Sequence, residues 1–165
     1  MAVSPIIASA ADNELDRSRV VALFERFKKL EGTWQGKSTK GWEDRMVMKV
    51  MARGTVIMET SEFVDEPEEG MASMYHLDGD RLLLTHYCEA GNVPVLQVTR
   101  IENEGNTITF DFKSGFNMSS RDIGHMDKMV FHWIDEDHFS SQWSWYKEGK
   151  QTWFEDIQYV RIKQK

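Results

Sequence analysis

Five histidines are the first candidates for chemistry in this chain, because an imidazole can act as an acid, a base or a metal ligand near neutral pH. They are His76, His86, His125, His132 and His138. A zinc site needs three or four ligands that converge in a tetrahedral arrangement, and the spacing of these histidines matches no such site. We therefore expect no bound metal ion.

The densest group of reactive side chains lies in residues 85–92, which read THYCEAGN. His86 or Tyr87 could reach a cavity, where either could orient a ligand or act as an acid or base. The alternative interpretation is a strand end with satisfied polar groups. The chain contains no nucleophile elbow, phosphate loop or dinucleotide-binding motif, so we assign no catalytic residue.

The pair Asp78-Gly79 is the strongest hairpin signal in the chain. If Leu77 lies opposite Leu82, His86 shares a strand face with Tyr75, whereas the histidine before the turn lies on the other face. This register predicts that one histidine of the hairpin points into the protein.

The last third of the chain is rich in aromatic side chains, and Trp143 shares a strand face with Ser141. Placing Ile134 opposite Phe139 puts His132 on this same face. The face is apolar with a few polar groups, which is typical of a ligand cavity. With the inner residues of the first strands, it predicts a cavity lined by Met46, Met48, Tyr75, His86, His132, Ser141 and Trp143.

The elements that position these residues are one helix and many strands. Apolar residues recur at steps of three and four up to Leu30, which predicts an amphipathic helix over residues 12–31, capped by Asp12 or Asn13. After it, about ten β-rich runs follow one another with short turns over residues 33–163. We therefore expect an all-β fold, a single antiparallel up-and-down β-barrel of about 8–10 strands. The helix should cover one end or one face of the barrel.

Composition excludes several classes of function. The chain has 165 residues, 41% hydrophobic and 28% charged, as expected for one globular domain, which we assign to residues 12–165. A net charge of −7 argues against a nucleic-acid partner, and no apolar run reaches the length of a membrane span. With Cys88 as the single cysteine, no intrachain disulfide can form. A homodimer is possible.

Residues 1–11 are small and apolar, and they form either a flexible tail or the remnant of an export signal. The first interpretation favours a cytoplasmic protein, and the second a periplasmic or secreted one.

The segment LEGTWQGKS, residues 30–38, resembles the first strand of the calycin superfamily, which includes the lipocalins. The resemblance rests on Gly32, on Trp34 and on Arg161 in the last strand. In lipocalins an arginine of the last strand packs across this tryptophan, and the resemblance implies the same for Arg161 and Trp34 as parts of the scaffold. The chain is most similar to uncharacterised bacterial lipocalin-like domains, for which the resemblance implies a barrel and no defined activity.

The function expected from these observations is non-enzymatic binding of a small apolar or amphipathic ligand inside the barrel, without a cofactor. Two alternatives stay open. One is an enzyme that uses a cavity histidine or tyrosine as acid or base. The other is haem binding through one histidine, which a resemblance of the first strand to nitrobindin-like barrels implies.

Overall fold

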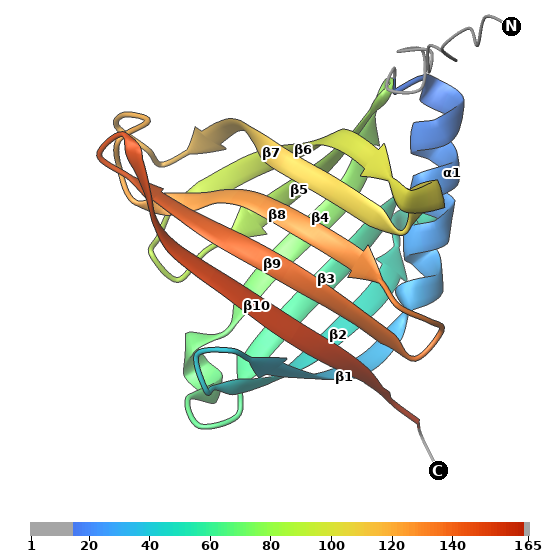
Figure 1. Cartoon of the computed structure of the whole chain (residues 1–165), viewed down its shortest axis with the longest axis horizontal. Coiled ribbons are helices and arrows are strands. Elements are labelled where there is room, and N and C mark those ends of the chain that lie inside the picture. The colour runs from blue at the N-terminus through green and yellow to red at the C-terminus, as the bar shows by residue number, and fades with distance from the viewer. Residues whose placement is uncertain (1–14, 164–165) are drawn as a thin grey trace, which may run out of the picture.

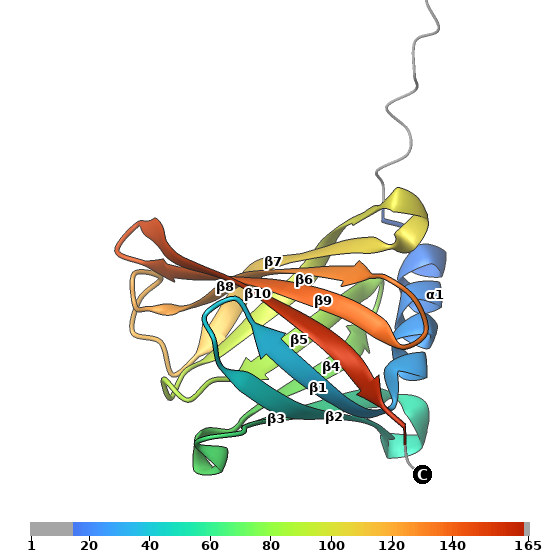
Figure 2. The same ribbon diagram turned by 60° about the horizontal axis from the view of Figure 1, so that its bottom comes forward.

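The computed structural model describes residues 15–163, which form a closed barrel of ten antiparallel strands (Figure 1). Each strand pairs with its neighbours in sequence order, and the first pairs with the last to close the barrel (Figure 2). The predicted up-and-down barrel is confirmed. The strands are β1 (Gly32–Ser38), β2 (Glu43–Met51), β3 (Val56–Phe63), β4 (Met71–Asp78), β5 (Arg81–Tyr87), β6 (Val93–Glu102), β7 (Thr107–Phe116), β8 (His125–Trp133), β9 (His138–Lys147) and β10 (Lys150–Ile162).

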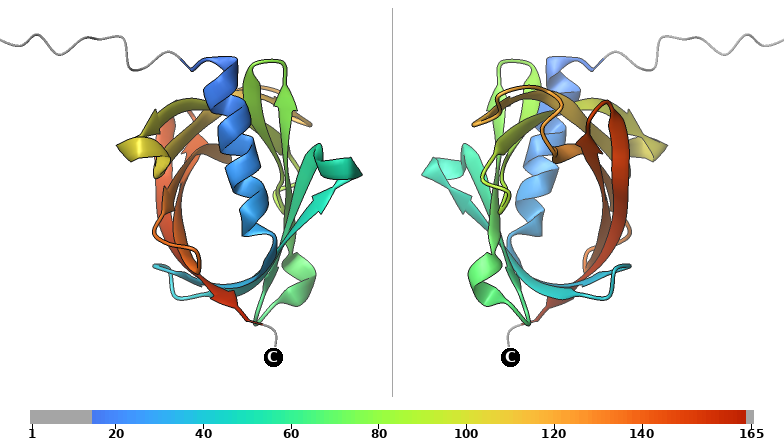
Figure 3. Two further views of the ribbon diagram at one scale, coloured as in Figure 1. Left: turned by 90° about the vertical axis from the view of Figure 1, so that its right-hand side faces the viewer. Right: turned by 90° about the vertical axis from the view of Figure 1, so that its left-hand side faces the viewer.

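A single helix, α1 (Arg17–Phe27), lies across one end of the barrel and continues into a 3₁₀ turn, Lys28–Leu30 (Figure 3). The carboxylate of Asp16 caps it by accepting a hydrogen bond of 2.8 Å from the backbone N–H of Arg19. The described helix thus begins later than the predicted residue 12, and the predicted cap positions Asp12 and Asn13 lie outside the described residues. Among residues 15–163, no helix is long and apolar enough to cross a membrane.

The apolar face of α1 plugs the barrel end that it covers. Phe27 is fully buried, and its ring lies 5.4 Å from Tyr75, 4.9 Å from Phe131 and 5.3 Å from Trp133, measured between ring centroids. Burying one such side chain contributes roughly 1.5–3 kcal/mol. Aromatic side chains therefore fill the barrel end beneath the helix, and among residues 15–163 no second α-helix covers the opposite end.

The predicted pairing of Trp34 with Arg161 is confirmed. The two residues are direct partners across β1 and β10, and the guanidinium carbon of Arg161 lies 4.1 Å from the centroid of the fully buried indole. The guanidinium also donates to the backbone carbonyls of Glu31, at 2.9 Å, and Lys29, at 3.0 Å. Gly32 leaves room for it, because a β-carbon there would lie 2.8 Å from Arg161. One side chain thus joins the end of the helix to the closing seam.

The hairpin of β4 and β5 has the predicted register, with Leu77 opposite Leu82 and Tyr75 opposite Leu84. The turn uses Gly79 in the left-handed region, at φ 65°. His86, opposite Ser73, therefore points inward as expected.

The predicted register of β8 and β9 is wrong by one residue. Phe139 pairs with Trp133 and not with Ile134, which is 58% exposed in the turn. The turn takes Ile134 because the backbone N–H groups of Ile134 and Asp135 both donate to the carbonyl of His138. A slip of one residue reverses every side chain of a strand. Phe131 consequently faces inward, and His132 lies on the outer face, where its Nδ1 is 3.3 Å from the hydroxyl of Thr107.

We expect Arg161→Lys to destabilise the fold by about 1–3 kcal/mol, because a lysine ammonium cannot reproduce the stacked, forked contacts of the guanidinium. Urea denaturation followed by tryptophan fluorescence measures the loss. The matched control is Arg45→Lys at an exposed position of β2, which should change stability by less than about 0.5 kcal/mol. Equal effects of the two substitutions would contradict the role given to Arg161.

Candidate functional site

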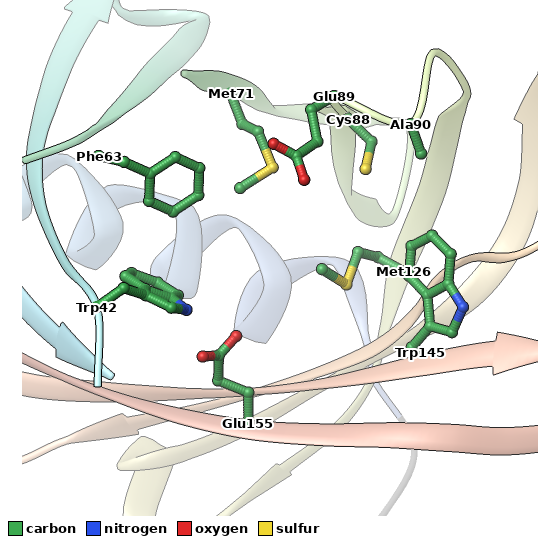
Figure 4. A pocket seen from close by; sticks show the side chains of 9 residues that line it. All are labelled: Trp42, Phe63, Met71, Cys88, Glu89, Ala90, Met126, Trp145 and Glu155. Atoms are coloured by element: carbon green, nitrogen blue, oxygen red, sulfur yellow. The ribbon is translucent and has the colours of Figure 1, made fainter. Parts of the chain in front are cut away.

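A cavity of about 400 Å³ lies at the barrel end opposite α1 (Figure 4). Trp42 and Phe63 form one wall and meet edge to face, with ring centroids 5.0 Å apart. Met126 and Trp145 form the opposite wall, and Met71 lies between the two walls (Figure 4). We call this space the mouth. Its walls are aromatic and thioether side chains, which suit an apolar ligand of varied shape.

Two carboxylates face the mouth between these walls. Glu155 of β10 projects into it from one side, and Glu89, from the loop after β5, projects from the other (Figure 4). Cys88 also lines the mouth, but burial raises the pKa of its thiol, which disfavours the reactive thiolate. The charge in this part of the mouth is therefore acidic.

Beneath the mouth the cavity narrows into two small spaces of about 40 and 20 Å³, which we call the floor. The mouth and the upper of these spaces share four lining residues, so they form one funnel: Trp42, Met71, Met126 and Glu155. The funnel ends against the aromatic side chains that pack beneath α1.

Six of the seven cavity residues predicted from the sequence line the floor: Met46, Met48, Tyr75, His86, Ser141 and Trp143. The seventh, His132, lies outside the barrel. Tyr87, the other residue considered for acid–base chemistry, is 48% exposed and does not line the funnel. That the six inner residues contact a ligand stays a prediction.

The carboxylates of the floor were not predicted from the sequence. Asp44 is buried and accepts hydrogen bonds from the hydroxyls of Ser61 and, at 3.4 Å, Tyr159. Glu59 accepts one of 2.7 Å from Tyr75. Each of these acids lies two residues from an inward-facing apolar residue on its own strand, Asp44 from Met46 and Glu59 from Ile57. This spacing could have indicated that both acids face inward. An acidic residue at an inward position of a barrel strand is rarely a solvated surface charge.

Burial dominates the electrostatics of the floor. It raises the pKa of Glu59 to about 7, to which the charge of Asp44 adds, while hydrogen bonds from Tyr75 and Ser73 act in the opposite direction. Burial likewise raises the pKa of Asp44 and of Glu155. The folded barrel thus keeps carboxylates where water solvates them poorly.

His86 completes the floor, and one of its ring nitrogens has no partner among the described residues. Its Nδ1 lies 3.0 Å from the hydroxyl of Ser73, and its ring centroid lies 5.2 Å from that of Trp143. The residue is 4% exposed, and burial lowers its pKa to about 4, so the ring is neutral at neutral pH. Its Nε2 makes no hydrogen bond with any described residue. Buried polar atoms normally have a partner, so an orphan beside a cavity points to a ligand or water.

These groups are aligned by the sheet itself. Met48, Glu59, Ser73 and His86 are successive cross-strand partners on β2, β3, β4 and β5, and so form one row across the inner wall. The row places Ser73 between the carboxylate and the imidazole.

A second hollow of about 590 Å³ lies outside the barrel, between α1 and the loop from β8 to β9. Its two arginines are already engaged. Arg26 lies 4.1 Å from the ring of Trp133 and donates to the carbonyl of Gly105, and Arg161 serves the seam described above. No orphaned buried polar atom of the described residues lines this hollow. We therefore place the candidate site in the funnel.

Haem, one of the alternatives raised by the sequence, does not fit the residues of the funnel. The mouth has a larger volume than either space of the floor, but no histidine is among the described residues that line it. His86 lies at the floor, beside a space of about 40 Å³, and carboxylates adjoin it. Both the volume and the charge at that point oppose an anionic macrocycle.

Glu59→Gln should become more stable relative to the wild type as pH rises. The folded pKa of about 7 exceeds the ordinary 4.5, so the stability that protonated Glu59 contributes is fully present below pH 4.5 and is lost as pH approaches 7. The variant should therefore gain about 2–3 kcal/mol on the wild type between these two pH values, measured by urea denaturation.

The free energy of unfolding of Glu59→Gln must be compared with that of the wild type at each pH, because His86 changes the stability of both proteins with pH in the opposite direction to Glu59. Its folded pKa of about 4 lies below the ordinary 6.5, so its contribution is present above pH 6.5 and is lost as pH falls towards 4. Glu62→Gln, at an exposed position of the same strand, is the matched control. A difference between Glu59→Gln and the wild type that stays constant with pH would contradict the burial of an ionisable Glu59.

Comparison with known proteins supports the fold and gives no function. No protein-family model and no curated protein matches this sequence. Among solved structures, the chain is similar to Rv2717c from M. tuberculosis, with a TM-score of 0.59 and 14% identity over 86% of this chain and 98% of that one. It is also similar to a protein of unknown function of the DUF3598 family from Nostoc punctiforme, with a TM-score of 0.55 and 14% identity over 81% of this chain. The chain spans about half of the Nostoc protein, 48%. These likenesses, and the closed ten-strand barrel, fit a calycin-like fold.

Proposed function

We propose that this barrel binds a small amphipathic molecule without transforming it. The molecule enters through the mouth, places its apolar body between the aromatic walls, and directs its polar end to the floor. The observation that carries this proposal is that the apolar mouth shares four lining residues with the space beside His86, whose Nε2 has no partner among the described residues. A site with apolar walls and a few polar groups at one point is the usual composition of a small-molecule pocket.

Size and access agree with a small ligand. The mouth, at about 400 Å³, falls within the range of roughly 300–1,000 Å³ that is common for such pockets. The helix closes the other end of the barrel, so the ligand enters and leaves by the same opening. The two constricted spaces at the floor admit only a small head group or water.

Binding is favoured over catalysis by the state of the reactive groups. Burial keeps the Cys88 thiol protonated and His86 neutral over the physiological range. Ser73 lies between His86 and Glu59, so its hydroxyl is held within a row of polar groups. An activated nucleophile needs a base on one side and open space on the other. The floor instead presents fixed groups that can hold a polar end.

The test uses the neutral apolar dye phenylnaphthylamine, whose fluorescence rises in an apolar site and can be excited by energy transfer from tryptophan. We expect saturable binding of one dye molecule. Because Trp42 and Trp145 both line the mouth, the bound dye should be excited by energy transfer from them. Ala90→Trp, in the mouth, should weaken binding about tenfold or more, since a filled pocket loses the buried area that drives binding.

Val160→Trp on the outer face of β10 adds the same indole away from the funnel and should leave dye binding unchanged. Absence of saturable binding to the wild type would contradict the proposed function. Equal binding to the wild type and Ala90→Trp would place the dye outside the mouth.

A further inference from the structure

We propose that the polar end of the ligand is a protonated amine, so that the barrel selects small organic cations with an apolar body. This inference rests on the proposed function and adds the chemical class of the ligand. Three observations support the inference: hydroxyl groups at the floor donate to carboxylates, Nε2 of His86 has no partner among the described residues, and the charged side chains of the funnel are acidic.

Three hydroxyl groups at the floor donate their protons to carboxylates. Tyr75 donates to Glu59, and Ser61 and Tyr159 donate to Asp44. The same is true of the third acid, Glu155, which accepts from the hydroxyl of Ser38 and from the side chain of Trp42. These carboxylates keep free acceptor capacity, because a carboxylate has about four lone-pair positions. A ligand that brings donors therefore suits this part of the floor.

The tautomer of His86 follows from the same inventory. The hydroxyl of Ser73 interacts with both Glu59 and His86 Nδ1. Above pH 7 Glu59 is mostly ionised and its carboxylate can only accept, so Ser73 donates to it and in turn accepts from Nδ1–H. Neutral His86 then presents the lone pair of Nε2, which has no protein partner, to the funnel. This acceptor lies on a side chain that is only 4% exposed, and it distinguishes the floor from an ordinary cluster of acids.

The formal charge of the funnel has one sign. Asp44, Glu59 and Glu155 line the floor, and no lysine or arginine does so among the described residues. Five further acids line the mouth and the hollow that adjoins it: Glu43, Asp65, Glu66, Glu69 and Glu89. The nearby cations lie outside the funnel: Lys37 pairs with Glu43 at 3.0 Å, and Lys40, on the turn after β1, acts on Glu155 through its charge. A cleft lined by one sign of charge attracts the opposite charge.

The rim shows the crowding of this charge directly. The pKa of Glu69 is raised by its contact with Glu66 and by the charges of Glu66, Glu89 and Glu68. A cation that enters the mouth relieves this repulsion. The aromatic faces of Trp42, Phe63 and Trp145 offer it a further attraction, since ring quadrupoles stabilise a cation at close range.

Three naphthalene ligands of nearly equal shape test the proposal in competition with phenylnaphthylamine at neutral pH. They are naphthylmethylamine, which is a cation, naphthylmethanol, which is neutral, and naphthoate, which is an anion. We expect the amine to bind at least about tenfold more tightly than the alcohol, because hydrogen bonds between charged groups are stronger than those of a neutral hydroxyl. The anion should bind most weakly. The quaternary trimethylammonium analogue has the charge without N–H donors, and it should bind about tenfold more weakly than the primary amine.

The variants locate the selectivity. Asp44→Asn keeps an acceptor for Ser61 and Tyr159 and should reduce the preference for amine over alcohol about tenfold. Glu89→Gln, at an exposed rim position that the fold does not depend on, should reduce it about two- to threefold through the lost attraction. Glu102→Gln, an exposed change of the same charge far from the mouth, should leave the preference unchanged.

The outcomes separate the two proposals. Equal affinity for amine and alcohol, with both displacing the dye, would overturn the inference while leaving the proposed function standing. Equal affinity for the primary amine and its quaternary analogue would overturn the hydrogen-bond basis of the inference. Failure of the dye itself to bind would overturn the proposed function and this inference together.

Discussion

The plug that α1 places in one end of the barrel is the constraint on which the rest of the structure depends. A closed barrel has two open ends, and here Phe27 and its aromatic neighbours fill one of them. Arg161 fixes the plug in place because the same guanidinium contacts the helix end and the closing seam. The interior is therefore reached from the other end alone, and any ligand must approach through the acidic, aromatic mouth.

Given that arrangement, the carboxylates of the floor are costly to the fold. A buried ionised group loses its hydration, and the raised pKa values of Glu59 and Asp44 express this loss. Tyrosine and serine hydroxyls compensate in part, one or two to each acid. Apolar residues of similar volume would give a more stable barrel. The acids are thus better explained by the proposed ligand site than by a contribution to stability, as expected where a protein trades stability for a site.

Much of the architecture could be predicted from local patterns. The helix, the number of strands, the Asp78-Gly79 hairpin and the pair Trp34 and Arg161 all follow from periodicity, turn chemistry or a short motif. His132 was misplaced because two backbone donors share the His138 carbonyl, a turn geometry that the sequence does not specify. The fold tolerates apolar residues on both faces of β8, so hydrophobic alternation alone could not correct the slip.

The floor was predictable only in part. Met46, Met48, Tyr75 and His86 were found because they belong to apolar faces with a clear register. Asp44 and Glu59 were missed because an acidic residue in an alternating strand is normally read as outward-facing. Their convergence also requires closure of the barrel, which brings Tyr159 of the last strand against Asp44 of the second. Contacts between such distant positions are a property of the closed sheet rather than of any local segment.

The state of His86 tests the central claim most directly, namely that the floor offers unsatisfied acceptors to a ligand. Long-range proton–nitrogen correlation spectra of isotope-labelled protein distinguish the two neutral tautomers and report the environment of each ring nitrogen. We predict a neutral ring protonated on Nδ1 at about pH 8, above the pKa of about 7 of Glu59, with an Nε2 resonance that shifts when naphthylmethylamine binds. A ring protonated on Nε2, or an Nε2 resonance unchanged at saturating amine, would contradict it.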